Sequence, residues 1–324
     1  MQDAHSWLSD VLRARPELVQ APQRPGYRRG IDVMRREQLG FSLGAGLQMF
    51  RRIHNRMPDL INDPWVNDHY FAMKYFGFIP EPNPADKLNT GRYIPEPLRD
   101  QIRVPRKLYV ATEPVLPPDD AIPPGPYYMK RALGCKTNAR VQWPPSPEER
   151  AAHEATLRRW MGEPYGVAWG EWWYGWGPDR WFLEEDLTAL IENQHNWHYW
   201  VRDGQAVLGQ ILVGTRPDSM DDNAQRWFHP DLTPIDAITV RRRPFDGRLP
   251  DRAQRYFELA SAIGARFDVV RVDIWDSVEG PPVLGELTLC DYHCQRRFNP
   301  PEFGRTMGQI LFGQQQAGLS CPAA

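Results

Sequence analysis

The chain has 324 residues, enough for one large or two ordinary domains with a sizeable core. Its 39 basic and 41 acidic residues give a formal charge of −2, so the whole-protein field does not indicate nucleic acid or an anionic membrane as a partner. There is no run of about 18 apolar residues and no signal-peptide pattern at the start, which favours a soluble cytoplasmic protein. Four cysteines are too few and too scattered for a disulfide framework in a chain of this size.

Four helical regions are expected. Residues 1 to about 60 contain LSDVLRARPEL and REQLGFSLGAGLQMFRRIHNRM, and the segment from Pro58 to Gly77 has an aromatic face compatible with a helix. The sequence SPEE places a cap at Ser146, proline at the first helical position and glutamate three residues after the cap, which predicts a helix to about Met161. Residues 250 to 264 have the apolar stripe of an amphipathic helix and a glycine at the end.

Several β-prone segments lie between these helices. Tyr127 to Lys130 follow a stiff, proline-rich connector that runs from Pro114 to Pro126. Phe182 to Leu187 form another short run, and Trp197 to Val207 are expected to form a strand, an Asp-Gly turn and a second strand. With the helix over residues 250 to 264 and the β-prone stretch that follows it, this order indicates an α/β core.

The most informative stretch is Phe267 to Leu289, which predicts two strands and a turn. Because side chains alternate along a strand, Arg271 shares one face with Asp273, and Glu286 shares one face with Thr288. A symmetric turn places Asp273 opposite Glu286, where two like charges about 5 Å apart repel by roughly 3 kcal/mol at an effective dielectric near 20. Mg²⁺ relieves such repulsion well, because one or two carboxylates can hold it while phosphates occupy its other positions. A surface hairpin in which Arg271 pairs with these acids is the alternative.

The pattern Arg271-x-Asp273, twelve residues, Glu286-x-Thr288 resembles the C-terminal metal-binding core of ATP-grasp ligases. RVDIW followed by GELT resembles in particular the TupA-like ATP-grasp family, which is associated with the synthesis of cell-surface polysaccharide and teichuronopeptide. Thr288 stands where many relatives carry asparagine. The resemblance covers roughly residues 60 to 310.

The resemblance implies an α/β (α+β) ATP-grasp fold in which two α/β subdomains grip ATP. A mainly helical region over residues 1–84 precedes the ATP-grasp domain over residues 85–324. Within that domain, the small nucleotide-gripping subdomain is expected at about 105–187 and the metal-binding subdomain at about 188–316.

The resemblance also implies a set of nucleotide contacts. Lys87, in an Asp-Lys pair at a helix start, and Lys130, at a strand end, correspond to lysines that hold phosphates, and Lys136 belongs to the loop that covers them. Glu184 and the next three backbone amides correspond to the residues that read the adenine edge, and His198 stands where relatives carry a lysine. A solvated edge is the alternative for the acids at 184 to 186, but their place between the Lys130 strand and the metal hairpin favours the nucleotide role. A packed or surface histidine explains His198 as well as a nucleotide contact does. The implied nucleotide-binding residues are Lys87, Lys130, Lys136, Glu184, Glu185, Asp186, Leu187 and His198.

The implied cofactors are ATP and Mg²⁺, with Asp273, Glu286 and Thr288 as metal ligands and Arg271 as the catalytic residue. The implied reaction is ligation of a carboxylate to an amine through an acylphosphate. Its substrates are expected to be small-molecule or glycan acids and amines, with no nucleic acid and no membrane span, and a homodimer is compatible with it.

Arg296 and Arg297 follow the loop that borders the acceptor site in this fold. They are candidates for clamping a carboxylate or phosphate of the substrate, although paired arginines are also common on solvated surfaces.

Two other functions stay open. One is phosphoryl transfer to a sugar hydroxyl at the same ATP site. The other is a non-catalytic glycan-binding accessory protein, because eight of the 13 tryptophans lie between Trp160 and Trp200 and could stack on sugar rings. We favour packing of these tryptophans in the small subdomain.

Overall fold

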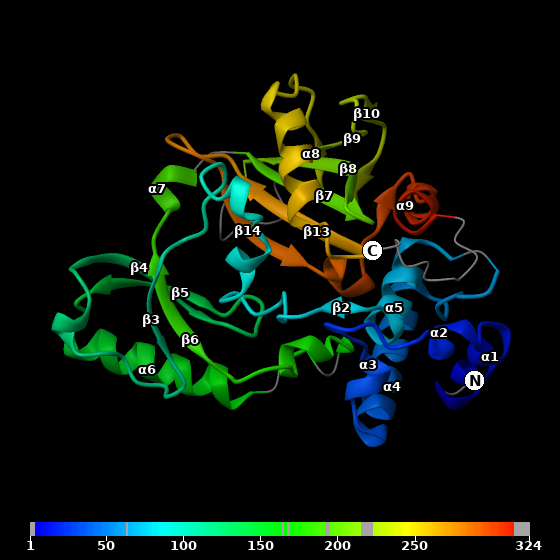
Figure 1. Ribbon diagram of the computed structural model, residues 1–324, viewed down its shortest axis with the longest axis horizontal. Coiled ribbons are helices and arrows are strands. Elements are labelled where there is room, and N and C mark those ends of the chain that lie inside the picture. The colour runs from blue at the N-terminus through cyan, green and yellow to red at the C-terminus, as the bar shows by residue number, and fades with distance from the viewer. Residues whose placement is uncertain are drawn as a thin grey trace.

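Two large β-sheets follow each other along the chain in the computed structural model, which describes residues 4–62, 64–163, 165–166, 169–191, 195–214 and 223–313 (Figure 1). Two further sheets of two strands each are present among these residues. The α-helices are α1 (Ala4–Ala14), α2 (Glu17–Gln20), α3 (Gly30–Val33), α4 (Arg36–His54), α5 (Val66–Phe76), α6 (Pro147–Gly162), α7 (Thr188–Ile191), α8 (Arg252–Ile263) and α9 (Phe303–Phe312). The 3-10 helices are η1 (Thr90–Tyr93), η2 (Glu96–Leu98), η3 (Asp119–Ala121), η5 (Trp172–Gly175) and η6 (Asp291–Cys294).

The strands up to the middle of the chain are β1 (Tyr27–Arg28), β2 (Ile79–Pro80), β3 (Lys107–Ala111), β4 (Gly125–Arg131), β5 (Asn138–Trp143), β6 (Trp181–Glu185), β7 (Asn196–Arg202) and β8 (Gln205–Val213). The later strands are β9 (Ala224–Phe228), β10 (Pro234–Ile235), β11 (Ile238–Thr239), β12 (Arg243–Pro244), β13 (Val269–Trp275), β14 (Val283–Thr288) and β15 (Phe298–Asn299).

The smaller sheet has the antiparallel order β3-β6-β4-β5, with α6 packed on it. Met129 of β4, Leu183 of β6 and Leu157 of α6 are buried in its core. The predicted cap of α6 is confirmed, because the Ser146 side chain accepts the N–H of Glu149 at 3.2 Å. In Figure 1 this sheet and α6 lie at the lower left.

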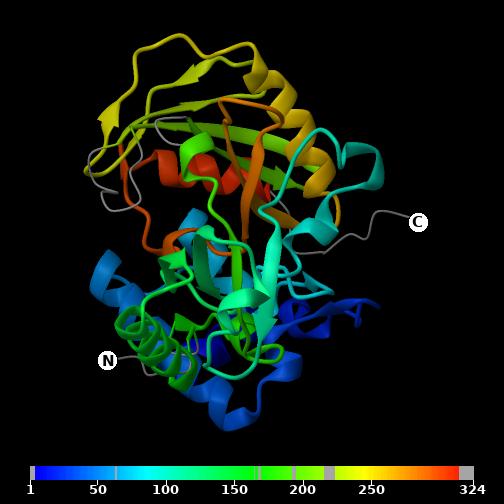
Figure 2. The ribbon, with the colours of Figure 1, turned by 90° about the vertical axis from the view of Figure 1, so that its left-hand side faces the viewer.

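The larger sheet has the order β10-β9-β8-β7-β13-β14, with β12 beside β9. Alternation along β7 gives this sheet two different faces. Tyr199 packs against Phe257 of α8, whereas the next residue, Trp200, stacks on Trp227, which in turn contacts Phe303 of α9. The sheet therefore lies between α8 and α9, as the two views show (Figures 1 and 2).

The N-terminal helices share the core of the larger sheet. Phe71 of α5 packs against Trp7 of α1, and α5 runs along α9. Trp172 and Trp173 also belong to this core, and the Trp172 indole N–H donates to the carbonyl of Lys74 at 2.7 Å. The prediction that the tryptophan-rich stretch packs in the small subdomain is thus wrong for these two residues.

Lys87 does not open a helix, contrary to the expectation for the Asp-Lys pair. The Asp86 carboxylate accepts the N–H of Leu88 at 3.0 Å, and the N–H of Lys87 donates to the carbonyl of Ala132 at 3.1 Å. The side chain of Asp86 and the end of β4 therefore hold this segment as a turn, and η1 begins only at Thr90.

Among the described helices, none combines the length and apolar character that crossing a membrane requires.

Candidate active site

The register of the C-terminal hairpin is as predicted. Asp273 of β13 lies opposite Glu286 of β14, and Arg271 lies opposite Thr288. A bulge follows immediately, because Ile274 pairs with Leu284. The side chain of Asp273 is only 7% exposed, whereas that of Glu286 is 53% exposed. One acid of the facing pair is therefore fixed inside the protein and the other remains accessible.

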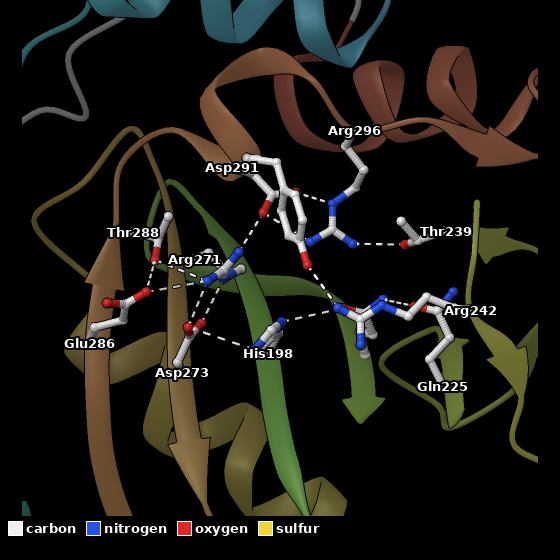
Figure 3. A network of polar contacts seen from close by, with 12 residues as sticks. His198, Gln225, Thr239, Arg242, Arg271, Asp273, Glu286, Thr288, Asp291 and Arg296 are labelled. Atoms are coloured by element: carbon white, nitrogen blue, oxygen red, sulfur yellow. Dashed lines mark hydrogen bonds and ion pairs between the residues drawn. The ribbon is translucent and has the colours of Figure 1, made fainter. Parts of the chain in front are cut away.

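Arg271 compensates the facing acids (Figure 3). Its Nε and Nη2 donate to the two carboxylate oxygens of Asp273, each at 2.7 Å, and Nη1 donates to Asp291. Nη2 also donates to the hydroxyl of Thr288 at 3.1 Å and lies 3.5 Å from Glu286 Oε1. Arg271 thus pairs with the acids, as in the alternative raised by the sequence, but Arg271 and Asp273 are buried and not part of a surface hairpin.

Asp291, which lies just after the hairpin in η6, is a third acid in the cluster and was not identified from the sequence. It also binds Arg296, whose Nη2 donates to it at 2.9 Å while Nη1 donates to Thr239 Oγ1 at 2.9 Å. The Arg296 guanidinium lies over the rings of Trp227 and Tyr292, at 5.3 and 4.4 Å from their centroids. Arg296 is therefore an interior residue that holds Asp291, whereas Arg297 is exposed.

The acids outnumber the cations in this cluster. Asp273, Glu286 and Asp291 face the two guanidinium groups of Arg271 and Arg296. Burial raises the pKa of Asp273 to about 7; Arg271 opposes this shift, and the other two carboxylates add to it. A bound cation would stabilise the charged form of Asp273.

The residues present fit a Mg²⁺ ion that is shared with a ligand. Asp273, Glu286 and Thr288 offer hard oxygen donors on one face of the hairpin. Within the described residues, no group of three or more His, Cys, Asp or Glu side chains is arranged to hold a metal. The donor set therefore suits an ion that completes its coordination with water and phosphate.

His198 lies beside Asp273 on the neighbouring strand β7, with its Nε2 3.6 Å from Asp273 Oδ2. Its Nδ1 lies 3.2 Å from the side-chain oxygen of Gln210. Burial, with the charges of Arg271 and Arg296, holds the pKa of His198 well below its usual value. The lowered pKa favours the neutral form of the imidazole over the charged form.

A second charge cluster lies on the smaller sheet. Glu184 of the central strand β6 is buried and binds the ammonium groups of both Lys130 and Lys107. Lys107 was not identified from the sequence, because it follows Arg103 and Arg106 in what resembles a solvated basic segment. The pairing of β3 with β6, which places Lys107 opposite Glu184, is the signal that could have found it.

Lys87 is influenced by charges of both clusters. Its ammonium donates to the carbonyl of Gly134. Burial lowers its pKa, and the Glu286 carboxylate is the largest charge that opposes this shift, while Lys130 adds to it. The predicted phosphate lysines Lys87 and Lys130 therefore lie within electrostatic range of each other, and Lys87 within range of the exposed acid of the hairpin.

The other predicted nucleotide residues are less open to a ligand. The N–H of Glu185 already donates to the carbonyl of Arg106 at 3.0 Å, and its carboxylate accepts from Arg103 at 2.9 Å. Asp186 accepts from Arg140 at 2.7 Å and from the N–H of Thr188 at 2.8 Å. Leu187 is buried, and Lys136 is exposed on the turn between β4 and β5.

No protein-family model matches the chain, and no curated protein sequence matches it. Among solved structures, the chain is similar to the ATP-grasp ligase PsnB in complex with a minimal precursor, with 13% identity and a TM-score of 0.35 over 71% of this chain and 61% of that chain. It is also similar to the VanG D-Ala:D-Ser ligase from Enterococcus faecalis, with 13% identity and a TM-score of 0.39 over 75% of this chain and 62% of that chain. The D-cycloserine synthetase DcsG gives 15% identity and a TM-score of 0.36 over 72% and 69% of the two chains.

The chain spans less than two thirds of the PsnB chain. Because the identities and TM-scores are low, the function proposed below rests on the geometry of the chain itself.

Asp291→Asn is expected to lower the free energy of unfolding by roughly 3–5 kcal/mol, because it leaves two buried guanidinium groups short of an anion. Urea unfolding measures the change. Asp251→Asn is the matched control: this exposed acid pairs with the exposed Arg248, and its loss is expected to cost less than about 1 kcal/mol. Equal losses in the two variants would contradict the central role of Asp291.

Proposed function

We propose that the chain is an ATP-dependent, ADP-forming carboxylate–amine ligase of the ATP-grasp type. One observation carries the proposal: Asp273 faces Glu286 beside the guanidinium of Arg271, and the ammonium of Lys87 lies within electrostatic range of Glu286. Carboxylates that suit Mg²⁺ thus lie within electrostatic range of a lysine that suits phosphate. This combination is what phosphoryl transfer requires, since positioning and charge stabilisation supply most of its catalysis.

The proposed cofactors are ATP and Mg²⁺. Asp273 and Glu286, with Thr288, would hold the ion, which when bound neutralises negative charge on the terminal phosphates. Lys87 and Lys130 would hold the nucleotide, and Lys107 joins them because it shares the carboxylate of Glu184 with Lys130. Because Glu184 is buried between these two lysines, it sets their positions in advance.

The proposed reaction has two steps. A substrate carboxylate attacks the γ-phosphorus of ATP, the bond to ADP breaks, and an acylphosphate forms. An amine then attacks the acyl carbon, phosphate leaves with its bonding electrons, and the nitrogen loses a proton. Arg271 would stabilise negative charge in both steps, and no nucleophile from the protein is needed.

The TupA-like motifs RVDIW and GELT support a finer assignment. On this basis we propose that the ligated product belongs to a cell-surface polysaccharide or its precursor. The corresponding place of action is the cytoplasm, where ATP is available.

The structure bears differently on the two alternative functions, phosphoryl transfer to a sugar and glycan binding. Phosphoryl transfer to a sugar hydroxyl would use the same ATP site and differs only in the acceptor. A glycan-binding accessory protein is disfavoured, because much of the tryptophan-rich stretch is not available for stacking on sugars. The buried tryptophans in it are Trp172, Trp173, Trp181, Trp197 and Trp200.

Hydroxylamine trapping tests the ligase proposal directly. With Mg-ATP and a panel of acids, the protein is expected to release ADP and, with hydroxylamine, to form a hydroxamate from the acylphosphate, which mass spectrometry detects. The same panel without an acid is the control. ADP release that yields a stable phosphorylated sugar, and no hydroxamate, would establish the phosphotransferase instead.

Glu286→Gln is expected to lower ADP formation by about 100-fold or more, because it removes a metal ligand worth several kcal/mol in the transition state. The side chain is half exposed, so the free energy of unfolding is expected to change by less than about 0.5 kcal/mol. Glu258→Gln, on an exposed side chain of α8, is the matched control. Turnover near that of the unchanged protein would refute the metal assignment.

Lys130→Ala is expected to weaken Mg-ATP binding by roughly tenfold or more, because it removes a charged donor to phosphate. Isothermal titration calorimetry measures the dissociation constant. Arg159→Ala, which removes an exposed cation from α6, is the control and is expected to leave nucleotide binding unchanged. An unaltered affinity in Lys130→Ala would exclude this lysine from the site.

A further inference from the structure

A basic pocket of about 340 Å³ adjoins the ion network of Arg271. Its lining includes four arginines, Arg241, Arg242, Arg296 and Arg297, and no Asp or Glu among the described residues. Its volume is that of a small-molecule site. Four guanidinium groups around so small a space repel one another, so an anion is the ligand that would stabilise the arrangement.

The backbone brings the arginines together. Strand β11 pairs with β15, and just beyond that pairing the N–H of Val240 donates to the carbonyl of Arg297 at 2.9 Å. The N–H of Arg242 donates back to the carbonyl of Thr239 at 3.0 Å, which closes a tight turn in which Arg241 has a φ of 74°. The pair Arg241 and Arg242 is thereby held beside Arg297 and its neighbour Arg296.

Two of the arginines are fixed by the protein. Arg296 is held by Asp291 and Thr239, and its side chain is only 3% exposed. Arg242 donates to the hydroxyl of Tyr292 at 2.9 Å. Arg296 shares the carboxylate of Asp291 with Arg271. These two arginines therefore give the pocket a positive wall that does not depend on a ligand.

The other two arginines are available. Arg241 and Arg297 are exposed, and within the part of the chain that the structure describes neither side chain has a hydrogen-bond or ion-pair partner. A guanidinium group presents two parallel donors that match the oxygens of a carboxylate or a phosphate. A bound anion would therefore gain its most favourable hydrogen bonds and ion pairs from Arg241 and Arg297.

The pocket is separated from the proposed catalytic cluster by one carboxylate. Asp291 accepts from Arg271 on one side and from Arg296, which lines the pocket, on the other. Arg296 also lies over the ring of Tyr292, whose hydroxyl accepts from Arg242, so Arg271, Arg296 and Arg242 follow one another from the hairpin to the pocket. The positive charges of this row repel a substrate ammonium and attract a substrate that carries more than one negative charge.

We propose that this pocket binds an oxyanion of the acid substrate, a carboxylate or a phosphate group, apart from the carboxylate that reacts. The acid substrate is then a small molecule with at least two anionic groups, one held by Arg241 and Arg297 and the other presented to Arg271. This inference rests on the proposed ligase function.

The test measures anion binding without Mg-ATP. Isothermal titration calorimetry at constant ionic strength compares inorganic phosphate, glutarate and β-alanine, which distinguish a phosphate, a dicarboxylate and a zwitterion. Glutarate or phosphate is expected to bind, and the probe that binds identifies whether the pocket accepts a carboxylate or a phosphate group. Arg241→Ala/Arg297→Ala is expected to weaken that binding roughly tenfold or more, and Arg241→Lys/Arg297→Lys to weaken it less, because lysine keeps the charge but not the paired donors.

Arg248→Ala is the matched control, because this arginine is 90% exposed and lies outside the pocket; it is expected to bind the anion like the unchanged protein. The proposal is overturned if neither anion binds at millimolar concentration, if the double alanine variant keeps full affinity, or if β-alanine binds as tightly as glutarate. Anion binding without ADP release from any acid contradicts the ligase alone. ADP release without anion binding contradicts the pocket alone.

Discussion

The buried guanidinium group of Arg271 is the interaction on which the rest of the site depends. Arg271 donates hydrogen bonds to Asp273, which lies on the same strand, and to Asp291, which follows the hairpin. Removing such charges from water costs several kcal/mol per ion, and only well-formed hydrogen bonds offset that cost. Because Asp273 would lose two hydrogen bonds by rotating, its carboxylate is held in place before any ligand arrives. The accessible acid, Glu286, can then adjust to a metal without disturbing the core.

The two large sheets share no strand, but each carries a cluster of buried charges. Glu184 organises Lys107 and Lys130 on the smaller sheet, as Asp291 organises Arg271 and Arg296 on the larger one. In each cluster a buried carboxylate binds two cations and so fixes their positions. Lys87, on the segment that precedes the smaller sheet, is within electrostatic range of both.

Local sequence patterns predicted the features that are determined by residues close together in the sequence. The alternation of apolar and charged residues from Phe267 to Leu289 placed Asp273 opposite Glu286, because a register error of one residue would have exposed the buried face of the strand. The Ser146 cap followed from the spacing of its own partners. Lys107 and Asp291 could not be found in this way, because what makes them part of the site is a pairing with residues 77 and 20 positions away. The same reason explains why Trp172 packs against the N-terminal helices and not in the smaller sheet.

Arg296 and Arg297 are neighbours of the same residue type, but the structure buries only Arg296. Arg296 lies in the segment between η6 and β15, where Asp291 and the rings of Trp227 and Tyr292 enclose it. Arg297, one residue later, remains exposed. A solvated pair and a substrate clamp were both compatible with the sequence, and the burial of Arg296 excludes only the solvated pair. Arg296 is part of the scaffold that positions the acids, because it shares the carboxylate of Asp291 with Arg271, whereas Arg297 leaves its charge at the surface beside the pocket.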